Sequence, residues 1–447
     1  MTSTRRLDGL RGWQRWLAGL AALGLAACTL APTPAPPLTA PPSEAPVAGA
    51  VSFMVFGDPA ELRAYEQVVA AFEAAQPAVD VPLIHIPGQN DYRTRLAADF
   101  AAGDPADVVL INYRRVPGFA SRGLLEPLGP SLLRSRVLAP DDFYPEAYYA
   151  FYWQGELMCV PQNVSSLVVY YNRDLFKTAG LAEPADDWDW DAFLQTAQAL
   201  TRDLDGDGQI DQYGLGVEPE LQRLAPFLWQ TGGLLTDNFN EPHQLALTDT
   251  KSLAALEWFV DLQLRHHVVP DAAAAQAEDS ETRFLNGRAG MYLNSRRIVP
   301  TLRESAAFDW DVAPLPSRAG QRATILHADG YCLAATAANK AAAWAFIEFA
   351  NGPVGQPIVA ATGRTVPSLR AVAESAAFLD PAQKPARSQV FLDQIEFVMI
   401  PPLIPNWADI EEVANAELER AFYGQVSALE AARTAGVRAA EYFEQEP

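Results

Sequence analysis

The most regular set of oxygen-bearing side chains in the sequence is Asp203, Asp205, Asp207 and Asp211, which are interspersed with glycines. Oxygen ligands at alternate positions around a glycine turn are typical of calcium-binding loops. The twelfth position of such a loop carries a bidentate glutamate, and Gly214 stands there in this chain. A plain Asp-Gly hairpin turn would use the same residues without a metal. The spacing therefore leaves two hypotheses open, a structural calcium site and a metal-free turn.

Other patterns of catalytic or cofactor chemistry find little support. His266 and His267 are adjacent, without the spacing of a zinc site, and the other histidines stand alone. The sequence has no Gly-x-Ser-x-Gly elbow, phosphate loop or dinucleotide fingerprint. Paired carboxylates can hydrolyse glycosidic bonds, but 55 acidic residues supply such pairs by chance. We predict a protein that is not an enzyme and needs no cofactor beyond the calcium considered above.

The composition indicates a folded, acidic protein of more than one domain. Hydrophobic residues make up 49% of the 447 residues and charged residues 20%, which is a globular balance. A chain of this length exceeds one ordinary hydrophobic core, so two or three domains are expected. The 33 Lys and Arg against 55 Asp and Glu leave a formal charge of -22, which repels phosphate backbones. We therefore predict no binding of nucleic acid, and a neutral ligand would tolerate this field.

Residues 1–27 are predicted to be a lipoprotein signal peptide. Four arginines precede an apolar stretch over residues 16–27 that is too short to span a bilayer. The stretch ends in Leu25-Ala26-Ala27-Cys28, which resembles the bacterial lipobox, whose cysteine thiol takes a diacylglycerol. Cys28 is therefore the predicted lipidation site and mature N-terminus. The alternatives are an ordinary cleavage site with a chance cysteine and a buried apolar helix.

Residues 28–50 form a predicted linker between that lipid and a folded body. The run over 31–50 is rich in proline, which favours extended polyproline geometry and provides no core. Such a spacer would hold the body away from the membrane surface. The predicted location is the cell membrane, with the protein lipid-anchored on the extracytoplasmic side.

The body beyond the linker alternates strand and helix patterns. Apolar runs at 51–56, 81–86 and 107–111 predict strands, and helical patterns cover 61–75 and 92–102. This alternation is typical of an α/β lobe. Further helices are predicted near residues 191–200, 250–264, 340–350 and 409–423.

Successive short segments of the body carry a family resemblance. They are DPADVV at 104–109, GLLEPL at 123–128, VPQN at 160–163, YYNRDLF at 170–176, WDW at 188–190, FLNGRAGM at 284–291, APLP at 313–316 and AWAFIEF at 343–349. In this order they resemble the extracellular solute-binding proteins of bacterial ABC importers, in the sugar-binding family 1 group that includes maltose-binding proteins. The similarity covers nearly the whole chain from Val51 onward.

The resemblance implies an α/β, periplasmic binding protein-like fold. Two α/β lobes, joined by a multi-strand hinge, would hold a ligand in the cleft between them and close over it. The expected first lobe comprises residues 51–159 and 332–372, and the expected second lobe comprises residues 160–331 and 373–447.

The same resemblance implies where the chain crosses the hinge: near Val160, again near Tyr331, and a third time over residues 370–380. If the first two crossing strands lie side by side, Cys159 and Cys332 would be neighbours able to form a disulfide. From the residues alone, two buried free cysteines remain the alternative, although an exported compartment permits pairing.

The function that the resemblance implies is capture of a mono- or oligosaccharide by a monomer, followed by delivery to the permease subunits of an ABC transporter in the membrane. Within the same fold, the alternative ligands are a polyol, a glycerol phosphodiester and a peptide. An extracellular carbohydrate-active enzyme is the alternative from a different class. Release of the sugar unchanged would distinguish a binding protein from an enzyme.

Sugars are bound through C–H faces that pack on aromatic rings and through hydroxyls that need carboxylate, amide or guanidinium partners. Strand ends of the first lobe offer such groups: Phe56 and Asp58 follow one strand, and Asn112, Tyr113 and Arg114 follow another. Asp58 could instead cap the following helix, and the later loop could simply be solvated.

The ligand candidates of the second lobe and hinge rest on the resemblance. Asn294, Ser295 and Arg296 follow a strand where relatives carry a ligand-facing loop, often with a tryptophan that this chain lacks. Trp407 lies where maltose-binding proteins place a stacking tryptophan, with a core position as the alternative. The remaining candidates, for which packing or hinge hydrogen bonding is the alternative, are Ser165, Glu220, Gln222, Trp229, Asp329 and Tyr331.

Overall fold

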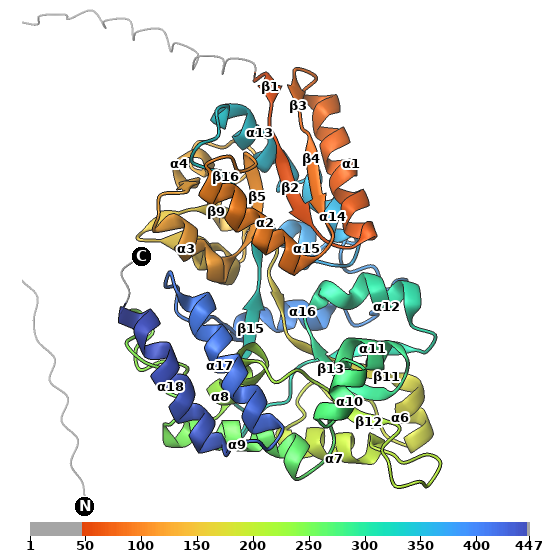
Figure 1. Cartoon of the computed structure of the whole chain (residues 1–447). Helices are drawn as coiled ribbons and strands as arrows, with labels where there is room; N and C mark the ends of the chain where they lie inside the picture. Colours follow the sequence, from red (N-terminus) through yellow and green to blue (C-terminus); the bar gives the residue numbers. More distant parts are fainter. Residues whose placement is uncertain (1–46, 445–447) are drawn as a thin grey trace, which may run out of the picture. The chain divides into compact units, whose positions relative to one another are not determined.

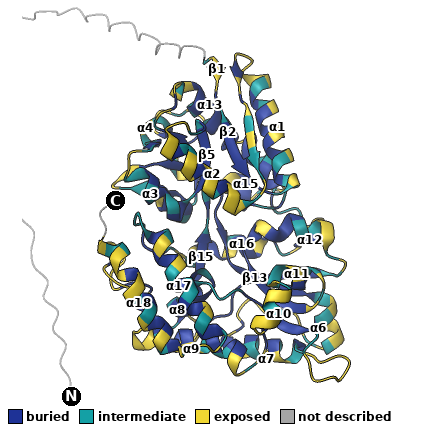
Figure 2. Ribbon diagram, in the orientation of Figure 1, coloured by how far each residue is buried: buried dark blue, intermediate teal, exposed yellow. Residues whose placement is uncertain are grey.

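Two hydrophobic cores form in the part of the chain that a computed structural model describes, residues 47–444 (Figure 1). The predicted signal peptide, Cys28 and most of the predicted linker lie outside the described residues. Buried strands run through the interior while exposed positions gather on the outer faces of helices (Figure 2). Over 47–444, none of the helices combines the length and the apolar character that crossing a membrane requires.

The first sheet runs in the order β4-β2-β5-β16-β6, with β9 also paired to β16. β2 lies parallel to β4 and β5, whereas β16 runs antiparallel to β5. β2 is apolar and buried along its whole length, as a strand covered on both faces requires. The bounds are β2 Phe53–Phe56, β4 Leu83–Ile86, β5 Val108–Asn112, β6 Leu125–Glu126, β9 Cys159–Pro161 and β16 Asp329–Ala334.

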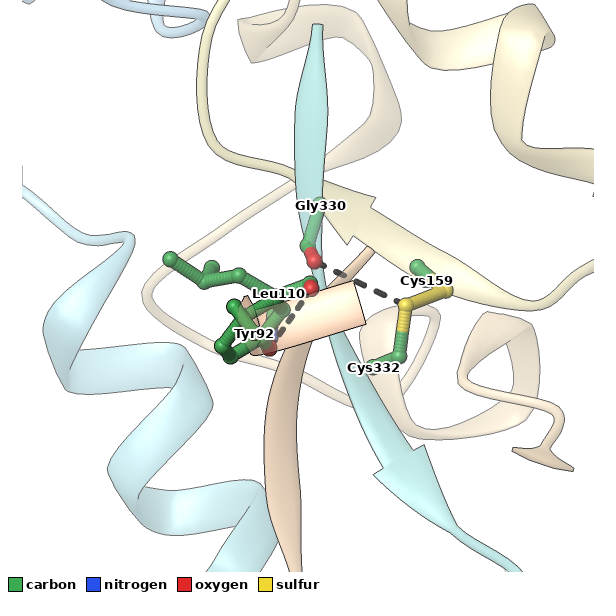
Figure 3. Close-up of a disulfide and its surroundings, with 5 residues drawn as sticks. All are labelled: Tyr92, Leu110, Cys159, Gly330 and Cys332. Atoms are coloured by element: carbon green, nitrogen blue, oxygen red, sulfur yellow. Dashed lines mark hydrogen bonds between the residues drawn. A yellow bond between two sulfur atoms is a disulfide. The ribbon is translucent and has the colours of Figure 1, made fainter. Parts of the chain in front are cut away.

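The main helices of the first lobe are α1 (Pro59–Ala75), α2 (Gln89–Ala102), α13 (Lys340–Ala350) and α14 (Gly355–Ala360). α1 begins where the Asp58 carboxylate accepts a hydrogen bond from the Glu61 backbone N–H at 2.9 Å. α2 is fastened to β5 because the Tyr92 hydroxyl donates to the Leu110 carbonyl at 2.8 Å (Figure 3). Both helices therefore start beside the sheet edge at which β2 and β5 end.

The second sheet has the order β12-β13-β11-β14. Along β11, Val168 and Tyr170 face the first core while Val169 and Tyr171 face the second, because successive side chains of a strand alternate between its faces. The strands are β11 Val168–Asn172, β12 Tyr213–Gly216, β13 Ala289–Asn294 and β14 Trp310–Ala313, and the main helices are α6 Arg173–Ala179, α7 Trp190–Leu200, α8 Leu221–Gln230, α9 Thr250–Leu264, α17 Trp407–Phe422 and α18 Ala428–Glu444.

Shorter elements complete the lobes. They are β1 Gly49–Ala50, β3 Val79–Asp80, η1 Tyr113–Arg115, α3 Val116–Ala120, α4 Gly129–Leu132, η2 Pro140–Asp142, α5 Pro145–Tyr148, η3 Tyr149–Phe151, β7 Tyr152–Trp153, β8 Glu156–Leu157, α10 Ala272–Ala277, α11 Ser280–Leu285, η4 Arg296–Ile298, α12 Val299–Ser305, α15 Arg370–Ala373, α16 Gln389–Asp393 and η5 Ile395–Phe397.

The hinge is built from neighbouring chain segments. β10 (Ser165–Ser166) and β17 (Val398–Met399) flank β15 (Thr324–His327) in a small sheet. β15 is followed directly by β16, and β9 is followed by β10, so these two segments cross between the main sheets side by side. Residues 329–331, which the expected boundaries assign to the second lobe, pair with β5 or β9 of the first sheet.

A disulfide joins Cys159 of β9 to Cys332 of β16, whose Cα atoms are 4.4 Å apart (Figure 3). The two cysteines face each other in the antiparallel ladder. The alternative of two free cysteines is therefore wrong. The bond closes a sequence separation of 173 residues and covalently joins these two strands of the first sheet, next to the hinge.

Candidate functional site

A cleft of about 510 Å³ opens where the two lobes and the hinge meet. Its walls are polar and come from chain segments far apart in the sequence. The lining residues are Phe56, Glu61, Gly88, Gln89, Asn90, Asp91, Arg93, Asn112 and Arg114 from the first lobe, Ser165, Glu220, Gln222, Arg223, Asn294, Ser295 and Arg297 from the second, and Gln162, Asn163, His327, Asp329, Arg364 and Thr365 around the hinge.

The fold explains why these side chains meet. Phe56 ends β2 and Asn112 ends β5, and parallel strands present the loops after their carboxyl ends at one edge. In the second lobe Asn294 ends β13, and Glu220 immediately precedes α8. The first turns of helices and the ends of strands from both lobes thus face one cavity.

Many of the predicted ligand residues line this cleft. They are Phe56, Asn112, Arg114, Ser165, Glu220, Gln222, Asn294, Ser295 and Asp329. Their contact with a ligand remains a prediction.

The remaining candidates lie elsewhere. Asp58 caps α1, as its alternative proposed, and Tyr113 is buried with its hydroxyl donating to the Leu326 carbonyl at 3.2 Å. Trp407 is 1% exposed, opens α17 and packs in the second core. Trp229 packs against the same core, and Tyr331 is fully buried among first-lobe aromatics.

Arg296 is also buried away from the cleft lining. Its Nε donates to the Gly363 carbonyl at 2.9 Å and its Nη1 to the Ser388 hydroxyl at 3.2 Å, while the guanidinium lies over Phe378. Burial lowers the pKa of Arg296 to about 9. These contacts tie the start of the loop after β13 to the segment that follows α14.

Sequence reasoning missed several lining residues. Asn90, Asp91 and Arg93 lie in the first turns of α2, which the periodicity placed too late by three residues. Arg223 is adjacent to the predicted Gln222, so the helix start at 221 was a usable signal. Arg364 comes from the segment after α14, where no local pattern marks a site.

An ion pair between Arg114 of η1 and Glu411 of α17 joins the two lobes at the rim of the cleft. The side chains are 9% and 10% exposed, so the pair is largely shielded from water. Asn112 orients the arginine, because its Oδ1 accepts from Arg114 Nε at 3.1 Å. The Asn112 amide in turn donates to Asp329 Oδ1 at 3.2 Å. The rim contact is therefore held in register by a network that reaches the hinge.

Burial controls the charge state of the cleft. Desolvation is the largest influence on Glu61 and raises its pKa to about 8, although the paired Arg364 acts in the opposite direction. Desolvation likewise raises the pKa of Asp329. The pKa of His327 is held well below its usual value, first by burial and then by Arg223, Arg114 and Arg297. At neutral pH the cleft therefore presents a neutral imidazole, and burial favours the protonated form of Glu61 more than in a water-exposed glutamate.

This arrangement can bind a polar molecule. Amide, guanidinium, hydroxyl and carboxyl groups on both walls offer donors and acceptors for several hydroxyl groups. Among the described residues, Phe56 is the one hydrocarbon ring in the lining, so the aromatic contribution is small.

The aspartate loop lies away from this cleft. Asp203, Asp205 and Asp211 bring carboxylate oxygens within 4.8 Å of one another, and Asp207 is not part of that group. The Asp203 carboxylate accepts hydrogen bonds from the Gly206 and Gly208 N–H groups at 2.7 and 2.9 Å, which lower its pKa. Both the calcium hypothesis and the turn hypothesis fit this geometry.

Two α/β lobes around a hinge of paired strands, with a polar cleft between them, define the periplasmic-binding-protein class. Residues 57–357 match the family described as bacterial extracellular solute-binding protein, and the chain belongs to that family.

Individual relatives agree with this assignment. A binding protein of Brucella abortus (strain 2308) is 23% identical over 368 residues, covering 81% of this chain and 85% of the relative. An ABC substrate-binding protein of Listeria monocytogenes, solved in complex with cycloalternan, has a TM-score of 0.80 at 23% identity and covers 88% of this chain and 99% of its own. The GacH receptor of Streptomyces glaucescens, solved unliganded and with acarbose, has a TM-score of 0.76 at 20% identity, covering 90% and 100%. The two structural likenesses establish the fold.

Proposed function

We propose that this protein captures a carbohydrate in the cleft between its lobes, outside the cytoplasm, and passes it unchanged to the permease of an ABC importer. The observation that carries the proposal is the polar lining contributed by both lobes. Two relatives of the same fold were solved with cycloalternan and acarbose. A ligand held by both walls binds the closed arrangement better than an open one, so it shifts the population towards closure.

Membrane attachment is a separate part of the proposal. A diacylglycerol on Cys28 and the proline-rich linker would tether a monomeric body at the extracytoplasmic face of the membrane. The chain would be recovered in the membrane fraction of its host, and Cys28→Ser would move it to the soluble fraction. Fractionation that finds both forms soluble would contradict lipid attachment without affecting the binding proposal.

Thermal unfolding of the full-length chain against mono- and oligosaccharides tests the binding proposal. A ligand at a hundred times its dissociation constant adds about 2.7 kcal/mol of stability, which is a clear rise in Tm. Chromatography of the recovered sugar checks that it is unaltered. A chemically changed sugar would favour the alternative of a carbohydrate-active enzyme, and stabilisation by peptides alone would replace the carbohydrate.

A variant pair sharpens that test. Gln222→Ala removes a partly exposed amide of the cleft lining, whereas Asn240→Ala changes an exposed loop outside it. We expect the first to weaken sugar binding by roughly tenfold, the value of one hydrogen bond to a ligand, and the second to leave it unchanged. Equal effects of the two substitutions would argue against this cleft as the site.

A further inference from the structure

Arginines from both lobes and the hinge converge on the cleft, although the chain as a whole is strongly acidic, with a formal charge of -22. They are Arg93, Arg114, Arg223, Arg297 and Arg364. The acidic groups of the lining are Glu61, Asp91, Glu220 and Asp329. The pKa of Glu61 is raised to about 8 and that of Asp329 is also raised, because both are buried. Burial therefore reduces the negative charge that the acidic residues bring to the cleft lining.

Four of these arginines have a carboxylate within ion-pair distance. Arg114 pairs with Glu411, Arg364 with Glu61, Arg297 with Glu281 at 2.6 Å, and Arg223 with Glu218 at the longer distance of 3.4 Å. These pairs orient the guanidinium groups and partly neutralise them.

Arg93 is different. Among residues 47–444 no carboxylate lies within ion-pair distance of its guanidinium, which donates to Asn90 Oδ1 at 3.3 Å. Burial, followed by the nearby cations Arg115 and Arg114, lowers the pKa of Arg93 to about 10, so the group stays charged at neutral pH. The first-lobe wall thus carries a cation whose charge is left uncompensated at close range.

Arg223 on the opposite wall is buried and incompletely satisfied. Its side chain is 7% exposed, and its Nη1 has no hydrogen-bond partner among the described residues. Its other contacts are long: Nε lies 3.4 Å from Glu218 Oε2, and Nη2 lies 3.4 Å from Asn294 Oδ1. A guanidinium has five N–H donors, and a buried donor without an acceptor is costly. A molecule bound in the cleft would supply that acceptor.

His327 is a second unsatisfied group in the same lining. Its Nε2 is buried without a partner among the described residues. Burial lowers its pKa most, and the charges of Arg223, Arg114 and Arg297, which line the same cleft, lower it further. A neutral imidazole that carries its proton on Nε2 can donate a hydrogen bond to an acceptor held by Arg223.

We propose that the solute is an acidic carbohydrate, a polyhydroxylated body that carries one carboxylate or phosphate group, and that this group binds Arg223. The inference rests on the proposed function and narrows its ligand class. Guanidinium matches the oxygen geometry of carboxylate and phosphate through paired hydrogen bonds, which hydroxyl groups do not reproduce. The amide and hydroxyl groups of the lining then serve the sugar hydroxyls, and Arg93 adds attraction from the facing lobe.

Isothermal titration of the full-length chain with matched sugars tests this inference. Each neutral sugar is paired with its uronic acid and its phosphate ester, for example glucose with glucuronate and glucose 6-phosphate, and acetate and inorganic phosphate serve as simple anions. We expect one acidic form to bind at least tenfold more tightly than its neutral parent, with an affinity that falls as salt is added. The carboxylate and phosphate arms show which acidic group is preferred.

Variants locate the acidic group. Arg223→Gln should weaken the acidic sugar by about 10- to 100-fold while changing the affinity for its neutral parent little, and Arg223→Lys should restore part of the loss. Arg63→Gln, on the exposed face of α1, is the matched control and should change neither affinity. If Arg223→Gln lowers the Tm of the unliganded chain, Arg93→Gln provides an independent test, because Arg93 is less buried. This variant should also weaken binding of the acidic sugar more than binding of its neutral parent.

The outcomes separate the inference from the function on which it rests. A neutral sugar that binds as tightly as its acidic forms overturns the inference and leaves the carbohydrate-binding proposal standing. The absence of binding by any neutral or acidic saccharide removes the proposed function itself. If acetate or inorganic phosphate binds as tightly as the sugar acids, the site recognises the anion and not the carbohydrate, which also overturns the inference.

Discussion

The hinge and the rim of the cleft connect the same two lobes by different means. At the hinge, the β9–β10 and β15–β16 segments cross between the lobes side by side, and the disulfide between Cys159 and Cys332 joins them where they enter the first sheet. At the rim, the connection between η1 and α17 is the ion pair of Arg114 with Glu411. A covalent bond does not open under native conditions, whereas an ion pair can exchange its partner for water or ligand. We therefore expect closure of the lobes to depend on the rim contact, while the covalent link next to the hinge stays intact.

The largest effect is expected at the hinge. Replacing both Cys159 and Cys332 by alanine should lower the free energy of unfolding by about 2–5 kcal/mol, because the unfolded chain gains freedom when a long loop is released. Sugar affinity should change little, since the backbone ladder remains. Urea unfolding and titration measure the two quantities. A reductant should destabilise the wild type by a similar amount and leave the double variant unchanged; a large loss of affinity would contradict the separation of hinge and rim.

The next largest effect is expected at the rim. Glu411→Gln removes the charge that faces Arg114 in a largely buried position, which should cost about 2–3 kcal/mol and weaken ligand binding because the closed arrangement loses its contact. Glu412→Gln, on the exposed neighbouring position of α17, is the matched control. Small-angle scattering of the unliganded chain should show a more extended particle for Glu411→Gln alone.

A substitution that adds bulk at the rim tests the same contact without changing any charge. A Cβ on Gly118 would approach the Pro405 carbonyl oxygen to 3.0 Å, so Gly118→Ala should also shift the population towards the open arrangement. If sugar affinity is unchanged in both Gly118→Ala and Glu411→Gln, the rim contact has no part in closure.

A smaller effect is expected in the pH dependence of the free energy of unfolding, to which the buried Glu61 of the cleft contributes and the disulfide does not. The folded pKa of Glu61, about 8, lies above its unfolded value near 4.5, so the folded state holds the proton over that interval. The stability that this proton contributes is fully present below about pH 4.5 and is lost as the pH rises through 8. The disulfide itself does not titrate, so it adds no such slope.

The measurement is urea unfolding between pH 5 and pH 8.5. Glu61→Gln should reduce the loss of stability with rising pH. Glu66→Gln, which is exposed on the same helix, should not. His327 has the opposite sign, because its lowered pKa makes the folded state lose stability as the pH falls below about 6.5. The informative quantity is therefore the difference in unfolding free energy between wild type and Glu61→Gln. If that difference stays constant with pH, the raised pKa of Glu61 is contradicted.

Local patterns predicted the elements that carry the cleft. Phe56, Asn112 and Asn294 lie in the lining because each ends a strand, and strand ends can be read from apolar runs followed by polar residues. The helix expected over 61–75 is α1, Pro59–Ala75, and the helix expected over 409–423 is α17, Trp407–Phe422.

The rest of the site depends on tertiary contacts that no local pattern contains. Arg364 reaches the cleft because α14 packs on α1, and His327 because β15 passes through the hinge. Trp407 shows the limit of residue type as a guide, since a large aromatic ring suits both a sugar face and a core, and here it is buried. Cys159 and Cys332 could be named as possible partners from the sequence, but whether they pair was decided only by the adjacency of β9 and β16.

The smallest effect concerns a region that belongs to neither hinge nor rim. If the loop of Asp203, Asp205 and Asp211 binds calcium in the millimolar to submillimolar range of extracellular sites, 1 mM calcium should add about 0.4–1.4 kcal/mol of stability. Asp203→Asn should abolish that gain, and magnesium should not reproduce it. Because the Asp203 carboxylate already accepts two backbone N–H groups, the same variant should lose a little stability without any metal. Equal stability of the wild type with calcium and with a chelator would assign the loop to a plain turn, and sugar affinity should stay constant throughout because the loop contributes nothing to the cleft lining.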